Sequence, residues 1–183
     1  MKQAPNSPEK LSREALDAYR LGAYEDAVLG FTAAKREFLD RGDEINAAEA
    51  ANNLSVVLLK MDQAHEALEA VQGTPEIFRH AGNQQLEAKA LGNLAAALEA
   101  TGEVKQAEEC YLQALECLGE SDDQETRSYI LQALSRLQLR GGKPFDALTS
   151  MQGALDSRPR LSLRDRLLRR LFNLPARLLG RGS

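Results

Sequence analysis

The chain has 183 residues, enough for one ordinary domain or a short array of repeats, and too few for a large multidomain enzyme. Hydrophobic residues make up 43% of it and aromatic residues 5%, with no Trp and a formal net charge of −4, which excludes wholesale disorder. Abundant Ala and Leu favour helices. No apolar stretch approaches the roughly 20 residues of a spanning helix, and no signal peptide is apparent, so we expect a cytoplasmic protein.

Residues 1–7 are expected to form a flexible N-terminus, and helices should follow it in pairs. Ser7 before Pro8 predicts a helix start, because Ser is a good N-cap and proline is tolerated in the first turn. A glycine that stops one helix is twice followed by a residue that caps the next, at Gly42-Asp43 and Gly82-Asn83. Ser121 with Gln124 is expected to form a capping box for a later helix.

The second helix pair contains an irregularity at Gly73-Thr74-Pro75. Proline lacks an amide hydrogen and disfavours helix in the residue before it. We therefore expect a break or kink here, with Thr74 capping a short new helix that runs through Phe78.

A repeat of 40 residues organises most of the chain. Alanines recur at this interval at Ala27, Ala67, Ala107 and Ala147. Hydrophobic residues keep the same register around them, which indicates that each unit buries the same face against its neighbour. The sequence thus predicts four helical hairpins, over about residues 8–47, 48–87, 88–127 and 128–159, with alanine where two helices cross closely.

The pattern resembles the tetratricopeptide repeat (TPR). The matching positions in the third unit are Leu91, Leu94, Ala95, Leu98, Gly102, Ala107, Tyr111 and Ala114. The longer step and the phrases Asn52-Asn53-Leu54-Ser55 and Gly92-Asn93-Leu94-Ala95 are similar to the repeats of kinesin light chain. The resemblance implies an all-α fold, a right-handed α-solenoid of four helix-turn-helix repeats, followed by a C-terminal amphipathic helix.

The same resemblance implies a binding groove lined by the first helix of each pair. An asparagine at the place of Asn53 and Asn93 grips the main chain of an extended peptide in that family. Cations outnumber the three carboxylates on this face, which are Glu9, Glu49 and Glu99. The expected ligand is therefore an acidic segment or a C-terminal carboxylate. The expected groove residues are Arg13, Arg20, Asn52, Asn53, Lys60, Lys89, Asn93, Tyr129, Gln132, Arg136 and Arg140.

Two alternatives to this groove stay open. The asparagine amides could face solvent or cap a local carbonyl group. The charged residues could form a solvated face with intrahelical pairs. Chaperone tails are not the expected guest, because Ser12 and Leu16 stand where the carboxylate clamp of chaperone-binding relatives needs Lys and Asn.

The composition changes at the C-terminus. Residues 157–183 hold eight Arg and one Asp, a charge of +7, which leaves −11 for the rest of the chain. Residues 160–183 are expected to form a basic amphipathic helix or tail. It could cap the solenoid, lie on an anionic membrane, or bind another copy or another partner. The residues expected to mediate this contact are Arg166, Leu167, Leu168, Arg169, Arg170, Leu171, Phe172 and Arg177.

No motif for catalysis is present. His65 and His80 stand apart without a surrounding motif, and no phosphate loop, metal-spaced cluster or nucleophile elbow occurs. We therefore expect neither enzymatic activity nor a metal or cofactor, and no binding to nucleic acid. The expected function is that of an adaptor or scaffold that binds a protein partner through an extended, acidic segment. The alternative is a membrane-peripheral structural or assembly factor attached through the C-terminal helix.

Overall fold

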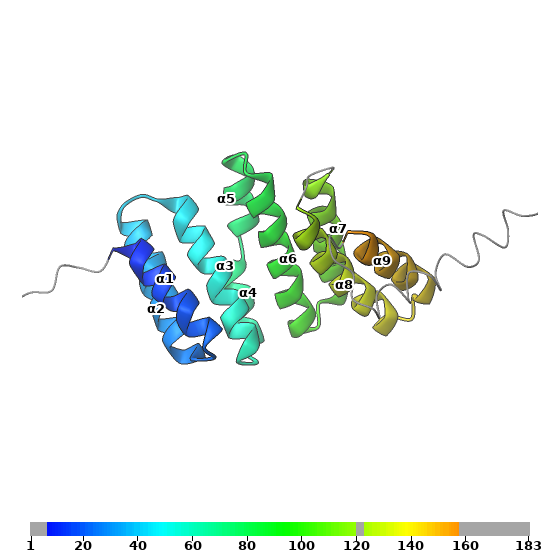
Figure 1. Ribbon diagram of the computed structural model, residues 1–183, viewed down its shortest axis with the longest axis horizontal. Helices are drawn as coiled ribbons and strands as arrows, with labels where there is room; N and C mark the ends of the chain where they lie inside the picture. The colour runs from blue at the N-terminus through cyan, green and yellow to red at the C-terminus, as the bar shows by residue number, and fades with distance from the viewer. Residues whose placement is uncertain (1–6, 120–122, 158–183) are drawn as a thin grey trace, which may run out of the picture. The chain divides into compact units, whose positions relative to one another are not determined.

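In the computed structural model, residues 7–119 and 123–157 are described, and they form nine α-helices and no strand (Figure 1). The chain forms two compact units, divided between Cys117 and Leu118. The all-α class and the hairpin repeats are confirmed, whereas the expectations for residues 1–6 and for the C-terminal helix lie outside the described residues. The helices are α1 (Pro8–Arg20), α2 (Tyr24–Asp40), α3 (Glu44–Lys60), α4 (Ala64–Val71), α5 (Thr74–His80), α6 (Gln84–Thr101), α7 (Val104–Leu118), α8 (Gln124–Arg140) and α9 (Pro144–Asp156).

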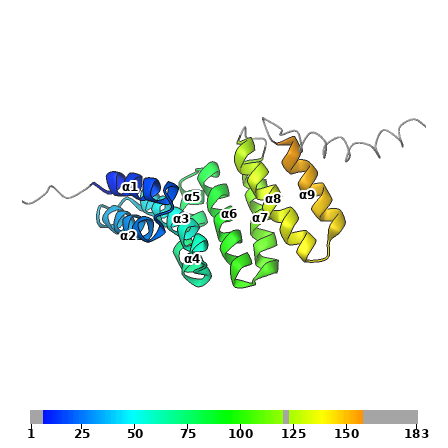
Figure 2. The ribbon, with the colours of Figure 1, turned by 60° about the horizontal axis from the view of Figure 1, so that its bottom comes forward.

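The first unit is built from hairpins that pack side by side (Figures 1 and 2). Helix α1 pairs with α2, and α3 pairs with α4 and α5. Helix α2 also packs against α3, and α6 packs against α4, α5 and α3. The first helices of successive hairpins, α1, α3 and α6, are therefore neighbours through the unit.

The predicted helix starts in this unit are confirmed. The side chains of Ser7, Asp43 and Asn83 each accept a hydrogen bond, of 3.1 to 3.3 Å, from the backbone amide three residues further on. These caps satisfy amides that the first turn of a helix leaves without an intrahelical partner. Hydrogen bonds from the side chain and the backbone of Asn46 hold the pKa of Asp43 below its usual value.

The turns inside the hairpins share one backbone geometry at an interval of 40 residues. Gly22, Gly102 and Gly142 have positive φ angles of 78°, 91° and 74°. Asp62 occupies the corresponding place in the second hairpin with φ 58°, the sole residue other than glycine with positive φ in the described part of the chain. The turn therefore demands the left-handed conformation even where the sequence supplies no glycine.

Small residues lie where the helices cross. Ala27, Ala67 and Ala107 are fully buried, which confirms the interpretation of the 40-residue spacing. Helices α1 and α2 approach each other closely at Gly30, where an added Cβ would lie 2.7 Å from the Cβ of Ala15. This contact requires glycine although glycine weakens a helix interior.

The predicted break in the second hairpin is present between α4 and α5. Helix α4 ends at Val71, and Gly73, with φ 82°, precedes α5. Thr74 does not cap α5 as expected, because its hydroxyl turns inward. Its Oγ1 lies 2.8 Å from the carbonyl oxygen of Val71 and 3.1 Å from Oδ1 of Asn52. A buried hydrogen bond therefore links the break between α4 and α5 to α3.

The second unit contains the hairpin of α8 and α9. Asp123 caps α8 by accepting from the amide of Thr126, so it takes the role expected of Ser121, which lies outside the described residues. Buried hydroxyls bind the facing helix: Ser128 Oγ donates to the carbonyl of Ala154 at 3.0 Å, and Ser135 Oγ donates to that of Ala147 at 2.7 Å. These bonds join the two helices along their contact.

Candidate functional site

Exposed and half-buried side chains of α1, α3 and α6 form matching stripes in the first unit, and we call these stripes together the A-helix face. In each helix they follow three- and four-residue spacing, which places them on one side. Equivalent positions are 40 residues apart, so each position recurs from one helix to the next. The face consists of Glu9, Arg13, Leu16 and Arg20 on α1, Glu49, Asn53, Val56 and Lys60 on α3, and Lys89, Asn93, Ala96 and Ala100 on α6.

Two amides of this face are available for a ligand. Asn53 and Asn93 are half-buried, and neither side chain makes a hydrogen bond to another described residue. Each amide presents two donors and one acceptor group. Because asparagine is a poor residue for a helix interior, its occurrence at both places is not explained by helix stability. The pair can bind both polar groups of a peptide backbone.

Asn52 does not belong to this face, and the expectation for it is wrong. Its side chain is 6% exposed and lies against Thr74, 22 residues further along the chain. The hydrogen bond between Asn52 and Thr74 therefore links α3 to the break between α4 and α5. The sequence placed two asparagines side by side, but only the contact with Thr74 shows which of them points inward.

Four cations lie on the A-helix face. Arg13, Lys60 and Lys89 are exposed and make no ion pair with any residue in the described ranges. The fourth cation, Arg20, lies 3.1 Å from Asp17 of its own helix. Three of the four cations therefore have their charge available for a ligand.

Two carboxylates oppose these cations. Glu9 and Glu49 are exposed, and Oε1 of Glu9 lies 3.8 Å from Nη1 of Arg41. Hydrogen bonds from its own backbone amide and from Ser7 hold the pKa of Glu9 below its usual value. Lys89 on α6 occupies the position that Glu9 and Glu49 have in the first two helices. The face of the first unit is therefore positive, with four cations against two carboxylates.

A third expected acid, Glu99, lies beside the face rather than on it. Glu99 is half-buried and accepts a hydrogen bond of 3.3 Å from Oη of Tyr111 on α7. The next residue, Ala100, is exposed and uncharged, and it occupies the position on α6 that is equivalent to Lys60 on α3. A comparison of positions 40 residues apart could have found this, because Glu99 is equivalent to the half-buried Leu59.

An apolar row, which the sequence interpretation missed, runs through the face. Leu16, Val56 and Ala96 occupy equivalent positions and are half-buried. Along each helix they lie one turn beyond the row that holds the two asparagines. Apolar surface beside free amides suits a peptide, whose side chains need burial while its backbone needs hydrogen bonds.

The remaining groove candidates lie in the second unit. Tyr129 is 53% exposed, and Arg136 and Arg140 are exposed on the same helix, α8. Gln132 is half-buried and donates to the carbonyl oxygen of Ser128 at 3.0 Å, so its amide is partly engaged within the helix. The tail candidates from Arg166 to Arg177 lie outside the described residues.

The described residues contain no candidate metal site. In residues 7–119 and 123–157, no group of three His, Cys, Asp or Glu side chains could hold a metal ion. Burial raises the pKa of the thiols of Cys110 and Cys117, which lowers their reactivity near neutral pH. Among the helices described, none is both long and apolar enough to cross a membrane.

Comparison with known proteins identifies the fold. Residues 46–120 match the family model of the tetratricopeptide repeat. The structure of BtubC (BKLC) from P. vanneervenii is similar with a TM-score of 0.71 and 18% identity, covering 88% of this chain and 72% of that chain. The structure of MamA 41-end from Desulfovibrio magneticus RS-1 is similar with a TM-score of 0.62 and 20% identity, covering 84% of this chain and 76% of that chain. No curated protein matches the sequence significantly, so the likeness is one of fold.

Proposed function

Since the chain is a tetratricopeptide-repeat protein, we propose that it is a non-enzymatic adaptor that binds an extended peptide segment of a partner protein on the A-helix face. Asn53 and Asn93 bind the peptide backbone in this proposal. Arg13, Lys60 and Lys89 pair with acidic side chains of the ligand. The apolar row of the face, defined above, buries its apolar side chains.

This proposal depends on the side-chain amides of Asn53 and Asn93, whose hydrogen-bonding groups are not used within the described structure. Asn53 and Asn93 keep their hydrogen-bonding groups half-exposed and unused by other described residues, on helices that pack against each other. An extended strand that runs across α3 and α6 meets both amides. Three cations that lack a described ion-pair partner favour an acidic sequence, although Glu9 and Glu49 limit how acidic it is.

The test uses the full chain and a displayed library of random peptides. Peptides selected by the wild-type protein are synthesised, and their affinities are measured by calorimetry for the wild type and for Asn53→Ala/Asn93→Ala. Loss of two amide contacts should weaken binding about tenfold or more, because each neutral hydrogen bond contributes about 0.5–1.5 kcal/mol. Alanine is the better helix former, so the double variant should be at least as stable as the wild type.

A matched control removes two exposed amides elsewhere. Gln72→Ala/Gln113→Ala changes the residue after α4 and the middle of α7, both outside the A-helix face, and should bind like the wild type. Equal affinity of the Asn53→Ala/Asn93→Ala protein would refute the proposed role of these amides. Selection of basic instead of acidic peptides would refute the role of the three cations.

A second candidate function is peripheral attachment to a membrane. It is supported by the eight arginines and the leucines of residues 157–183, a composition suited to an anionic lipid surface. Co-sedimentation with vesicles of phosphatidylserine and phosphatidylcholine tests it. Arg166→Ser/Arg169→Ser/Arg170→Ser should reduce binding severalfold, and unchanged binding, or none by the wild type, would contradict it.

A further inference from the structure

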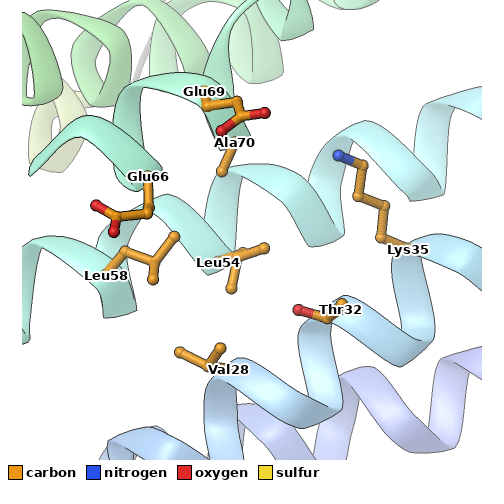
Figure 3. Close-up of a pocket in the computed structure, with 8 residues that line it drawn as sticks. All are labelled: Val28, Thr32, Lys35, Leu54, Leu58, Glu66, Glu69 and Ala70. Atoms are coloured by element: carbon orange, nitrogen blue, oxygen red, sulfur yellow. The ribbon is translucent and has the colours of Figure 1, made fainter. Parts of the chain in front are cut away.

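A pocket of about 280 Å³ lies on the side of α3 opposite to the A-helix face (Figure 3). Helices α2 and α4 form its walls and α3 forms its floor. Leu54 and Leu58 of α3 line it, and at about 100° per residue they point roughly 130° and 170° away from the middle of the α3 stripe. The pocket is therefore separate from the face that we propose as the peptide site.

The inside of the pocket is mainly apolar. Val28 of α2, Leu54 and Leu58 of α3 and Ala70 of α4 line it, and Thr32 of α2 contributes one hydroxyl group. Its volume lies just below the range of small-molecule sites, about 300–1,000 Å³. An opening of this size and lining accommodates one aliphatic side chain of a partner, with the adjoining backbone at the mouth.

The mouth of the pocket carries opposed charges. Lys35 stands on the α2 wall, and Glu66 and Glu69 stand on the α4 wall. Figure 3 shows the ammonium group of Lys35 and the carboxylate of Glu69 pointing toward each other across the opening. None of the three makes an ion pair with another described residue within 4.0 Å.

The charged residues at the mouth of the pocket favour a ligand of positive charge. Helix α4 contributes these two glutamates to the pocket, and it contains no Lys or Arg. A cation on the ligand meets two carboxylates there, whereas an anion meets only Lys35. The single lysine can donate to a peptide carbonyl at the opposite edge.

We propose that this pocket binds a basic peptide segment in which a leucine side chain fills the apolar interior and a neighbouring arginine pairs with Glu66 and Glu69. This second site lies on the other side of α3 from the A-helix face and takes a ligand of the opposite charge. The two sites can therefore be occupied together and tested apart.

The experiment measures binding of fluorescein-labelled peptides to the full chain by fluorescence anisotropy at low ionic strength. The probe is Gly-Arg-Leu-Arg-Gly, and the comparison peptides are Gly-Arg-Ser-Arg-Gly and Gly-Glu-Leu-Glu-Gly. We expect only the first to bind well. Glu66→Gln/Glu69→Gln should weaken it about three- to tenfold, since exposed ion pairs are individually modest, and added salt should do the same.

Two further variants distinguish binding in the pocket from nonspecific attraction of a basic peptide to the acidic protein. Glu76→Gln/Glu109→Gln removes the same charge from exposed positions of α5 and α7, outside the pocket, and should leave the affinity unchanged. Ala70→Leu fills the interior and should abolish the preference for leucine over serine. The proposal is overturned if the probe does not bind, if the leucine and serine peptides bind equally, or if both double variants weaken binding alike.

Discussion

Gly30→Ala probes the close crossing of α1 and α2. In an open helix position this change would stabilise the protein by about 1 kcal/mol. Here the new Cβ would lie 2.7 Å from Cβ and 3.3 Å from Cα of Ala15, and a backbone atom cannot be relieved by a rotamer change. Overpacking of this kind costs about 1–3 kcal/mol, so after the helix gain is subtracted we expect a net destabilisation of about 1 kcal/mol, and of about 2 kcal/mol at most. The thermal midpoint, followed by circular dichroism, should fall by roughly 2–8 °C, since about 1 kcal/mol shifts the midpoint of a chain of this size by about 2–4 °C.

Two companion variants sharpen this prediction. Gly153→Ala in α9 meets only the movable end of Leu131, whose Cδ1 would lie 3.2 Å from the added methyl group, so its stability should match or exceed the wild type. Ala15→Gly combined with Gly30→Ala removes the 2.7 Å contact between the two Cβ atoms, and the two changes should therefore show a favourable coupling energy. A Gly30→Ala protein as stable as the wild type would refute the packing argument.

Three other predictions concern polar groups of the first unit, each followed by urea unfolding with circular dichroism. Thr74→Val leaves the buried side chain of Asn52 without its partner and should cost about 1–3 kcal/mol, whereas an unchanged unfolding midpoint would contradict the contact. Arg79→Leu leaves the buried carboxylate of Glu87 without the guanidinium group 2.7 Å away, so the unfolding midpoint should fall. In the double variant Arg79→Leu/Glu87→Met, most of the lost stability should return, because no buried charge is left unpaired. A double variant as unstable as Arg79→Leu would argue against the ion pair. The lowered pKa of Asp43 means that its cap stabilises α3 above roughly pH 4 and that this contribution is lost as the pH falls through the folded pKa. The advantage of the wild type over Asp43→Ala should therefore shrink in acid, and a constant difference would contradict the assignment.

The fold could be predicted because its determinants repeat. Alanines 40 residues apart, glycine stops and polar caps are local signals, and each recurrence reinforces the same register. Even the break at Gly73-Thr74-Pro75 is visible in the sequence, since proline acts on its immediate neighbours. The inward turn of Thr74 is not visible, because it depends on Asn52 in a helix 22 residues earlier.

The candidate site was predicted less completely. Periodicity places Asn53 and Asn93 on an exposed stripe, but it cannot decide between adjacent residues near the edge of that stripe. Asn52 and Glu99 lie at such edges, and contacts with Thr74 and Tyr111 turn them away from it. The pocket between α2 and α4 depends on side chains from three helices, which no local pattern brings together.

Site-directed photocrosslinking tests most directly whether the ligand lies on the A-helix face. p-Benzoylphenylalanine is placed at Val56 or Ala96 on that face, or at the exposed Leu112 of α7, and each protein is irradiated with an acidic peptide selected from the library. We predict crosslinks from positions 56 and 96 and none from position 112. Crosslinking from position 112 alone, or to the same extent from all three, would contradict the account.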